Sequence, residues 1–294
     1  PNYIPQLLDK AKLFDVKILD INSEKSDFGA ILYDNSLYFS SARNAARKEY
    51  GWNKEPFLDI YRADYNADGT LTNPTTVDAL NSKYHEGSVT VSADGNTLYF
   101  SSDSFRERTF EKDKANNLKL GKNSIFKATK NGDTWGNITM LPFNSKEFSC
   151  ANPSLSRDGK TLYFASKGHP GYGYYDLFVS KRLDDSWTNW TKPENLGNII
   201  NSPGYELSIF LSAKGDKAYV GREQDIWEID NTVKQDPVAL VKGKVYDSKT
   251  KKVMSAPIVY NALKTNKELG TAISDPSTGS YSIVLPYGEK YSFM

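Results

Sequence analysis

Leu98-Tyr-Phe-Ser-Ser102 is the stretch of sequence that decides the fold, because it returns along the chain in close copies. The copies are Leu37-Tyr-Phe-Ser-Ser41, Leu162-Tyr-Phe-Ala-Ser166 and Ala218-Tyr-Val-Gly-Arg222, so that the four occurrences lie 61, 64 and 56 residues apart. Self-similarity at a nearly fixed period is the signature of a fold built from repeated supersecondary units. The chain therefore holds four copies of one structural unit.

Each copy stands between the same neighbours. An Asn-Ser pair comes first, then a strand-like run, a tight turn such as Asp94-Gly95, the quoted stretch, and a second run such as Asp176-Leu-Phe-Val-Ser180. The four Asn residues are Asn22, Asn81, Asn144 and Asn201. Short runs that alternate apolar and polar residues predict strands, and Asp-Gly between two of them predicts a hairpin. Each unit is expected to be a small antiparallel sheet, with a further outer strand at 134–141 and 187–196 in two units.

Four-stranded sheets that recur about every 60 residues, each with an apolar face that it cannot bury alone, predict a β-propeller. We expect an all-β chain in which 13–232 form a propeller of four blades. The fourth unit offers no outer strand of its own after Ile229. The run at 16–20 stands directly before Asn22, where an outer strand precedes the other Asn-Ser pairs, and is expected to complete the last blade and close the ring.

A second module is expected after the propeller. Strand-like runs at 241–247, 257–260 and 280–288, separated by turn residues, predict that 238–294 form part of a small β-sandwich. Further strands of this sandwich are expected beyond Met294, since the chain ends within a strand-like run.

A short helix is expected before the propeller, over 1–12. Apolar residues at Leu7, Leu8 and Ala11 have helical spacing. Two interpretations stay open: the last helix of an upstream tetratricopeptide array, or an isolated amphipathic helix. The chain begins at Pro1 without an initiator Met, so we expect it to be a piece of a longer protein.

The repeat resembles a known family. Asn-Ser-x-x-x-Glu, followed by Leu155-Ser-Arg-Asp-Gly-Lys-Thr-Leu-Tyr-Phe-Ala-Ser166 and Asp176-Leu-Phe-Val-Ser180, resembles the WD-repeat-like PD motif. That motif occurs in the propellers of TolB and of OmpA-family outer-membrane proteins of Bacteroidetes. The segment 238–294 resembles the carboxypeptidase regulatory-like domain, a prealbumin-like sandwich. The order of helix, propeller and sandwich is similar to the PorE-type OmpA-family proteins of type IX secretion and gliding.

The resemblance implies a function. It implies a non-catalytic scaffold of the periplasm, associated with the outer membrane, that binds other proteins of the same envelope complex. It implies contact with peptidoglycan only through a C-terminal OmpA-like domain outside this chain. An alternative stays open: a propeller that hydrolyses or binds glycans with carboxylates at the mouth of its channel.

Composition and motifs exclude several other classes. Lys and Arg number 37 against 36 Asp and Glu, so the net charge of +1 does not favour nucleic acid as a partner. No apolar run approaches the about 20 residues that a membrane-spanning helix needs. With one cysteine, Cys150, and two histidines, His85 and His169, neither a zinc site nor a Cys/His nucleophile is expected. We therefore predict no enzyme, no catalytic residue, no metal and no cofactor.

Long connections suggest where partners bind. The links between the second and third strands of the first three units, 42–58, 103–123 and 167–175, are long and open on one face of a propeller. Binding residues are commonly carried on loops that a rigid scaffold positions. Tolerated insertions and a plain solvated surface are the alternatives. The residues predicted for a partner-binding face are Arg106, Arg108, Lys112, Tyr172, Tyr174, Tyr175, Glu86 and Glu206.

A ring of acidic residues is also expected at the channel mouth. Asp27, Glu86, Ser149 and Glu206 each lie five positions after a repeated Asn. Two interpretations follow for the three carboxylates: a cation site, or caps for backbone amides and partners for nearby Arg or Lys. Ser149 interrupts the ring in either case.

Overall fold

The structure is a computed structural model that describes residues 17–51, 53–114, 118–212, 216–223, 225–230 and 238–294. These residues form strands and loops, and their only helical element is the short 3-10 helix η2 (Ser104–Glu107). The prediction of an all-β chain is confirmed. The helix expected at 1–12 lies outside the described residues.

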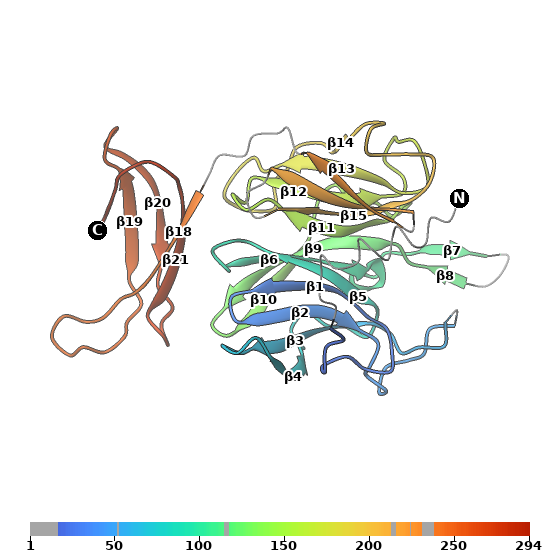
Figure 1. The fold of residues 1–294 in the computed structure, drawn as a ribbon, viewed down its shortest axis with the longest axis horizontal. Coiled ribbons are helices and arrows are strands. Elements are labelled where there is room, and N and C mark those ends of the chain that lie inside the picture. Colours follow the sequence, from blue (N-terminus) through green and yellow to red (C-terminus); the bar gives the residue numbers. More distant parts are fainter. Residues whose placement is uncertain (1–16, 52, 115–117, 213–215, 224, 231–237) are drawn as a thin grey trace, which may run out of the picture.

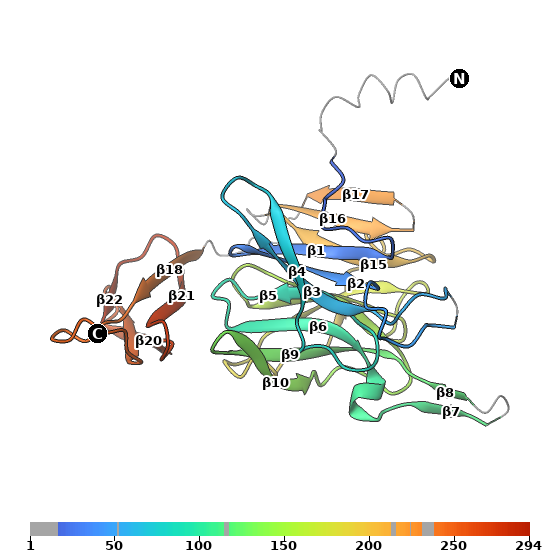
Figure 2. The same cartoon turned by 90° about the horizontal axis from the view of Figure 1, so that it is seen from below.

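The four repeats form four separate antiparallel sheets (Figures 1 and 2). The first is β1 (Asp27–Tyr33), β2 (Ser36–Ser41), β3 (Asp59–Tyr65) and β4 (Leu71–Thr76). The second is β5 (Glu86–Val91), β6 (Thr97–Asp103), β9 (Asn123–Asn131) and β10 (Thr134–Met140). The third is β11 (Cys150–Leu155), β12 (Thr161–Ser166), β13 (Asp176–Lys181) and β14 (Glu194–Asn195). The fourth has β15 (Glu206–Leu211), β16 (Lys217–Arg222) and β17 (Asp225–Asp230).

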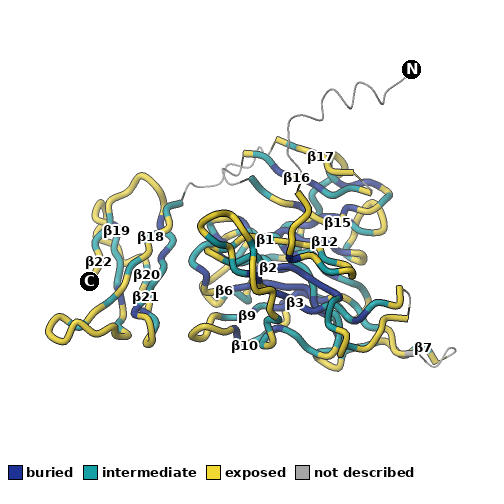
Figure 3. Tube along the Cα trace, turned by 60° about the horizontal axis from the view of Figure 1, so that its bottom comes forward, coloured by how far each residue is buried: buried dark blue, intermediate teal, exposed yellow. Residues whose placement is uncertain are grey.

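The repeated Leu-Tyr-Phe stretch forms the second strand of each sheet and joins neighbouring sheets. Leu98 and Phe100 pack in one apolar cluster with Ile60 of the first sheet. Tyr99, between them in sequence, packs in a second cluster with Phe164 of the third sheet. Successive side chains of a strand point to opposite faces, so one strand supplies both interfaces. Burial is accordingly concentrated in these strands, as the dark blue segments of Figure 3 show.

The repeated Asn fastens each sheet to the one before it. The side chain of Asn81 accepts a hydrogen bond from the N–H of Ile60 at 2.7 Å and donates one to its carbonyl at 3.0 Å. Asn144 holds Ile125 in the same way, at 2.8 Å for both bonds. Asn201 holds Leu177 at 2.8 and 2.9 Å. Each residue held in this way lies near the start of the third strand of its sheet, which is β3, β9 or β13. The Asn thus satisfies backbone groups that would otherwise be buried without partners.

The fourth sheet lacks this fastening among the described residues. Ile226 occupies the clamped position of β17 and is 82% exposed, whereas Ile60, Ile125 and Leu177 are fully buried. Asn22, which heads the first repeat, is exposed and makes no side-chain hydrogen bond in the described part of the chain. The expected closing strand at 16–20 is wrong for residues 17–20, which form no strand; residue 16 lies outside the described residues. Ile18 there is 81% exposed, so no burial stabilises an extended pairing with β17.

The C-terminal module consists of two further small sheets. β18 (Val238–Lys244) pairs with β21 (Ser280–Pro286), and β19 (Pro257–Ala262) pairs with both β20 (Lys267–Ile273) and β22 (Tyr291–Phe293). Ile258 of one sheet and Ile283 and Leu285 of the other form one apolar cluster. An ion pair of 3.2 Å joins Lys242 of β18 to Asp34, in the turn between β1 and β2.

Candidate functional site

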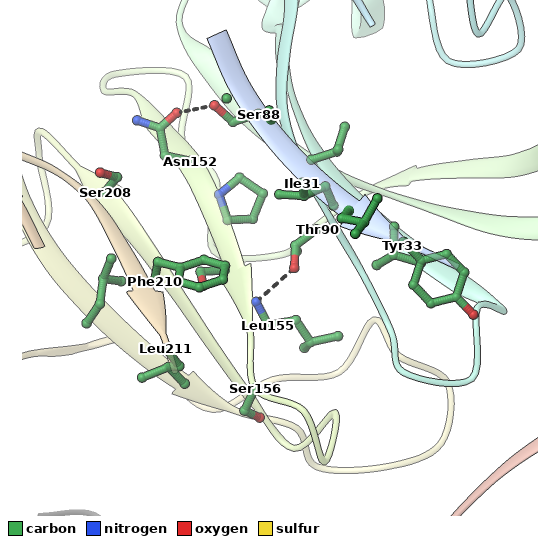
Figure 4. A pocket seen from close by; sticks show the side chains of 18 of the residues that line it. Ile31, Tyr33, Ser88, Thr90, Asn152, Leu155, Ser156, Ser208, Phe210 and Leu211 are labelled. Atoms are coloured by element: carbon green, nitrogen blue, oxygen red, sulfur yellow. Dashed lines mark hydrogen bonds between the residues drawn. The ribbon is translucent and has the colours of Figure 1, made fainter. Parts of the chain in front are cut away.

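The first strands of the four repeats line one cavity of about 800 Å³ (Figure 4). These strands are β1, β5, β11 and β15. Its wall is mainly apolar, with Ile31, Leu155 and Phe210 among the side chains that face it in Figure 4. Cavities of this size, apolar with a few polar groups, are typical of binding sites.

Polar groups cross the cavity wall from sheet to sheet. The hydroxyl of Ser88 donates to the side-chain oxygen of Asn152 at 2.8 Å, and the amide of Asn152 donates to the carbonyl of Leu207 at 2.6 Å. The N–H of Leu155 donates to the hydroxyl of Thr90 at 3.1 Å. Ser88 and Asn152 have positive φ values, 30° and 55°, at β-bulges of their strands. A bulge re-aims a side chain, and here it brings the two residues together.

A smaller pocket of about 220 Å³ adjoins this cavity and shares Phe28, Ser88, Asn152 and Leu207 with it; we call this smaller pocket the mouth. His85 lies at the mouth, and its Nδ1 accepts a hydrogen bond of 3.1 Å from the N–H of Leu58. Because Nδ1 accepts, the neutral ring carries its proton on Nε2, a buried atom without a hydrogen-bond partner among the described residues. Burial lowers the pKa of His85, so the ring favours this neutral form.

The three carboxylates expected at the channel mouth are each paired with an arginine. The pairs are Asp27 with Arg43 at 2.7 Å, Glu86 with Arg106 at 3.3 Å and Glu206 with Arg222 at 3.4 Å. Each carboxylate also accepts the backbone N–H and the hydroxyl of the Ser that follows the repeated Asn. The interpretation as caps and ion-pair partners is therefore confirmed for these residues.

The environments of Glu86 and Asp27 shift the pKa values of these two carboxylates in opposite directions. Burial raises the pKa of Glu86, and hydrogen bonds from Ser82 offset only part of that effect. Burial also acts to raise the pKa of Asp27, but hydrogen bonds from Arg43 and from serines outweigh it, and the net pKa is lowered.

Cys150, and not Ser149, occupies the fourth equivalent position. Cys150 pairs with Ser166 across β11 and β12, just as Glu86 pairs with Ser102 across β5 and β6. The expectation for Ser149 was wrong because the connection after Asn144 is one residue longer than in the other repeats. The thiol is fully buried, and burial raises its pKa to about 12, so it stays protonated.

Among the predicted partner-binding residues, Arg106 is turned inward. Its guanidinium lies over the rings of Phe100 and Phe126, at 5.4 and 5.8 Å, and donates to the carbonyl of Leu80. Together with the ion pair to Glu86, these contacts fix Arg106 inside the protein. Glu86 and Glu206 are likewise buried. These three residues are thus removed from an exposed face.

The remaining predicted residues lie in the connections between second and third strands. Arg108 ends η2 in the left-handed conformation, with φ 56°. Lys112 is exposed on β7 (Glu111–Asp113), which pairs with β8 (Leu118–Leu120) in a hairpin that projects from the sheets in Figure 2. Tyr172 and Tyr174 are 54% and 57% exposed, and Tyr175 is half-buried.

One residue of this surface was missed from the sequence. Tyr205 is 45% exposed and stacks on Tyr174, with ring centroids 5.1 Å apart and an angle of 6° between the rings. The N–H of Tyr174 donates to the carbonyl of Gly204 at 3.0 Å, which holds the two segments together. A signal was present: Tyr205 directly precedes Glu206, as His85 at the mouth precedes Glu86. We call Tyr172, Tyr174 and Tyr205 the tyrosine surface.

No family model and no curated protein matches this chain. The solved structures to which the chain is similar include the following three, each at low identity. For a Mycobacterium tuberculosis puromycin-hydrolyzing peptidase, identity is 12% and the TM-score is 0.39, covering 84% of this chain and 36% of the peptidase. For an endo-arabinase from Bacteroides thetaiotaomicron VPI-5482, identity is 11% and the TM-score 0.37, covering 90% and 94%. For PpgL, a periplasmic gluconolactonase of Pseudomonas aeruginosa, identity is 12% and the TM-score 0.30, covering 85% and 70%.

These similarities correct one expectation. We predicted that the chain is not an enzyme, and that prediction is contradicted, because the three structures it resembles are a peptidase, an arabinase and a lactonase. The chain spans about a third of the peptidase's length.

In the described ranges, no three His, Cys, Asp or Glu side chains gather as a metal site. No helix of the described residues is long and apolar enough to cross a membrane.

Proposed function

We propose that the four repeat sheets are the blades of a four-bladed β-propeller and that 238–294 belong to a sandwich of the carboxypeptidase regulatory-like kind. We further propose that the propeller binds a partner protein through the tyrosine surface beside the channel mouth. The observation that carries this function is the stacked pair of Tyr174 and Tyr205, both about half exposed.

The chemistry of the tyrosine surface supports protein binding. Tyrosine offers a large contact area, a polar hydroxyl and only two side-chain torsions to immobilise, and it is enriched in the cores of protein interfaces. The backbone beneath is also held firmly, since the carboxylate of Asp176 accepts the N–H groups of Tyr172 and Gly173. A surface ordered before binding loses less conformational entropy when the partner docks.

The neighbouring connections extend the same face. The β6–β9 and β12–β13 connections both join second to third strands, and in Figure 1 the β7–β8 hairpin extends on the side away from the C-terminal sheets. Lys112 of that hairpin is exposed, and polar residues at the rim of an interface are typical of protein-binding surfaces.

The compartment and the assembly are part of the proposal and rest on the resemblance of the repeat motif. We propose a place in the periplasm, in an outer-membrane-associated complex of the type IX secretion or gliding kind. Fractionation of the source cells tests the compartment: recovery in the cytoplasmic fraction contradicts it.

Replacement of the tyrosine surface tests the binding function. The variant Tyr172→Ser/Tyr174→Ser/Tyr205→Ser is compared with Tyr246→Ser/Tyr287→Ser, whose side chains are 52% and 71% exposed in the C-terminal module. Proteins captured from an envelope extract are cross-linked and quantified. A partner that cross-links to the wild type and the control, and about tenfold less to the triple variant, supports the function. Equal capture by all three chains contradicts it.

A further inference from the structure

The cavity between the sheets is lined by strand edges. β1, β5, β11 and β15 are each the terminal strand of their sheet, so each has one edge without a strand partner. All four strands line the cavity. A terminal strand presents unpaired N–H and C=O groups along its free edge, and such an edge can pair with another extended chain.

The four edges are not equally available. Hydrogen bonds between Ser88 and Asn152 and between Thr90 and Leu155 bridge β5 to β11. Across the same cavity lie β1 and β15, and in the described part of the chain no hydrogen bond joins these two strands. Apart from the bond between the amide of Asn152 and the carbonyl of Leu207, no hydrogen bond among the described residues joins another sheet to β1 or to residues 208–211 of β15.

Of these two edges, β15 has the longer regular stretch. Its register with β16 shifts once, between Glu206 and Ser208 at its start. Its last four residues, 208–211, pair with β16 in unbroken register. β1 pairs irregularly with β2 between Phe28 and Ile31, and Gly29 within it has a φ of 67°. A bulged strand disrupts the ladder that an added strand needs. Residues 208–211 of β15 are therefore the edge to which an added strand can pair.

The side chains beside this edge are apolar and exposed. Phe210 and Leu207 of β15 are 61% and 41% exposed, and Leu32 of β1, on the opposite wall, is 54% exposed. Among the residues that line the cavity, the charged ones are Asp34 and Arg157, which belong to β-turns at one end of the strands. The middle of the cavity favours an occupant without charge, since burying an unpaired charge is costly.

We propose that the cavity binds an extended, uncharged segment of a partner polypeptide, which adds as a strand to the free edge of β15. Backbone hydrogen bonds to residues 208–211 supply the pairing, and apolar side chains of the segment pack on Phe210 and Leu32. This is strand addition, in which the ladder gives affinity and alternate side chains give selectivity. Leu240 of β18 lines the cavity too. The proposal extends the partner-binding function but concerns a surface separate from the tyrosine surface.

A synthetic peptide tests the proposal directly. The probe is a capped hexapeptide that alternates valine and threonine and carries a fluorophore, titrated with the full chain and followed by anisotropy. Two matched peptides carry N-methyl groups on the odd or on the even residues. Alternate N–H groups of a strand face opposite neighbours, so one methylated set loses the bonds to β15. We expect saturable binding of the parent peptide, and about tenfold weaker binding for one methylated peptide only.

Variants of the chain identify the site. Phe210→Ser is expected to weaken peptide binding about tenfold, and Ile273→Ser, a control on a residue 72% exposed in β20, to leave it unchanged. The triple tyrosine variant is expected to bind the peptide like the wild type. The experiment therefore distinguishes failure of strand addition at β15 from failure of partner binding at the tyrosine surface. Absence of saturable binding, equal binding of both methylated peptides and the parent, or an unchanged affinity in a folded Phe210→Ser chain would overturn the proposal.

Discussion

Asn201 holds both backbone groups of Leu177, the N–H at 2.8 Å and the carbonyl at 2.9 Å, and all the groups involved are buried. Asn201→Ala leaves a buried donor and a buried acceptor without partners, and each costs about 1–3 kcal/mol. We therefore expect the free energy of unfolding to fall by about 2–6 kcal/mol, measured by urea denaturation. Asn22→Ala is the matched control, since Asn22 is exposed, and should change it by less than about 0.5 kcal/mol. A comparable loss for Asn22→Ala would show that the fourth sheet is clamped in solution.

The buried ion pair between Glu86 and Arg106 should behave asymmetrically. Arg106→Met leaves the carboxylate of Glu86 buried without its countercharge, which costs about 3–5 kcal/mol. The double variant Glu86→Gln/Arg106→Met should recover part of that loss. Arg62→Ala breaks an exposed pair with Asp64 and should leave the stability almost unchanged, because solvent screens exposed pairs. Equal losses for Arg106→Met and Arg62→Ala, by thermal unfolding, would contradict the buried role of Arg106.

His85 should make stability depend on pH in a defined direction. Burial lowers its folded pKa below the ordinary value of 6.5, so the folded state binds fewer protons than the unfolded state. His85 therefore contributes to the stability of the folded state above pH 6.5, and this contribution is lost as the pH falls below 6.5. Protonation also removes the Nδ1 acceptor for the N–H of Leu58. His85→Gln should flatten the decline in unfolding free energy between about pH 7 and 5. An unchanged slope of the unfolding free energy against pH, measured by denaturation at a series of pH values, would refute this assignment.

Cys150 should be unreactive in the folded protein. Its thiol is fully buried and its pKa is raised to about 12 by burial, so neither access nor the thiolate form is available. We expect a thiol-specific disulfide reagent at pH 8 to label the native chain slowly and to label it completely in denaturant. Because this is the chain's one cysteine, the absorbance change reports it alone. Rapid stoichiometric labelling of the native protein would contradict the buried placement.

The sequence repeat predicted the inner strands well and only one of the two outer strands. The outer strand expected at 134–141 is confirmed as β10 (Thr134–Met140). Leu162-Tyr-Phe-Ala-Ser166 lies within β12, as predicted. Its side chains are buried on both faces of the sheet, so its apolar pattern is a strong signal. The strand expected at 187–196 shrinks to β14 (Glu194–Asn195). Outer strands bury less apolar surface, so their alternation is a weaker signal. Pro193 also lacks the N–H that a longer ladder would need.

The candidate site was predicted only in part, for reasons of packing and loop length. The sequence placed Tyr172 and Tyr174 on an exposed loop, as the structure does. A charged residue in a long connection is ordinarily solvated, so nothing local indicated that Arg106 folds back onto two phenylalanine rings. The pairing of Tyr174 with Tyr205 joins two connections, and such a contact depends on how the third and fourth sheets stack.

The sharing of the Leu-Tyr-Phe side chains between two interfaces has a consequence for how the protein unfolds. Since Tyr99 belongs to one core and Phe100 to another, a single repeat has no core that is its own. The cooperativity of unfolding must then be transmitted through the interfaces between neighbouring sheets, as in a one-dimensional chain of coupled units. Amide hydrogens of β6 and β12, enclosed on both sides, should exchange slowest, and those of β17 at the open end should exchange first.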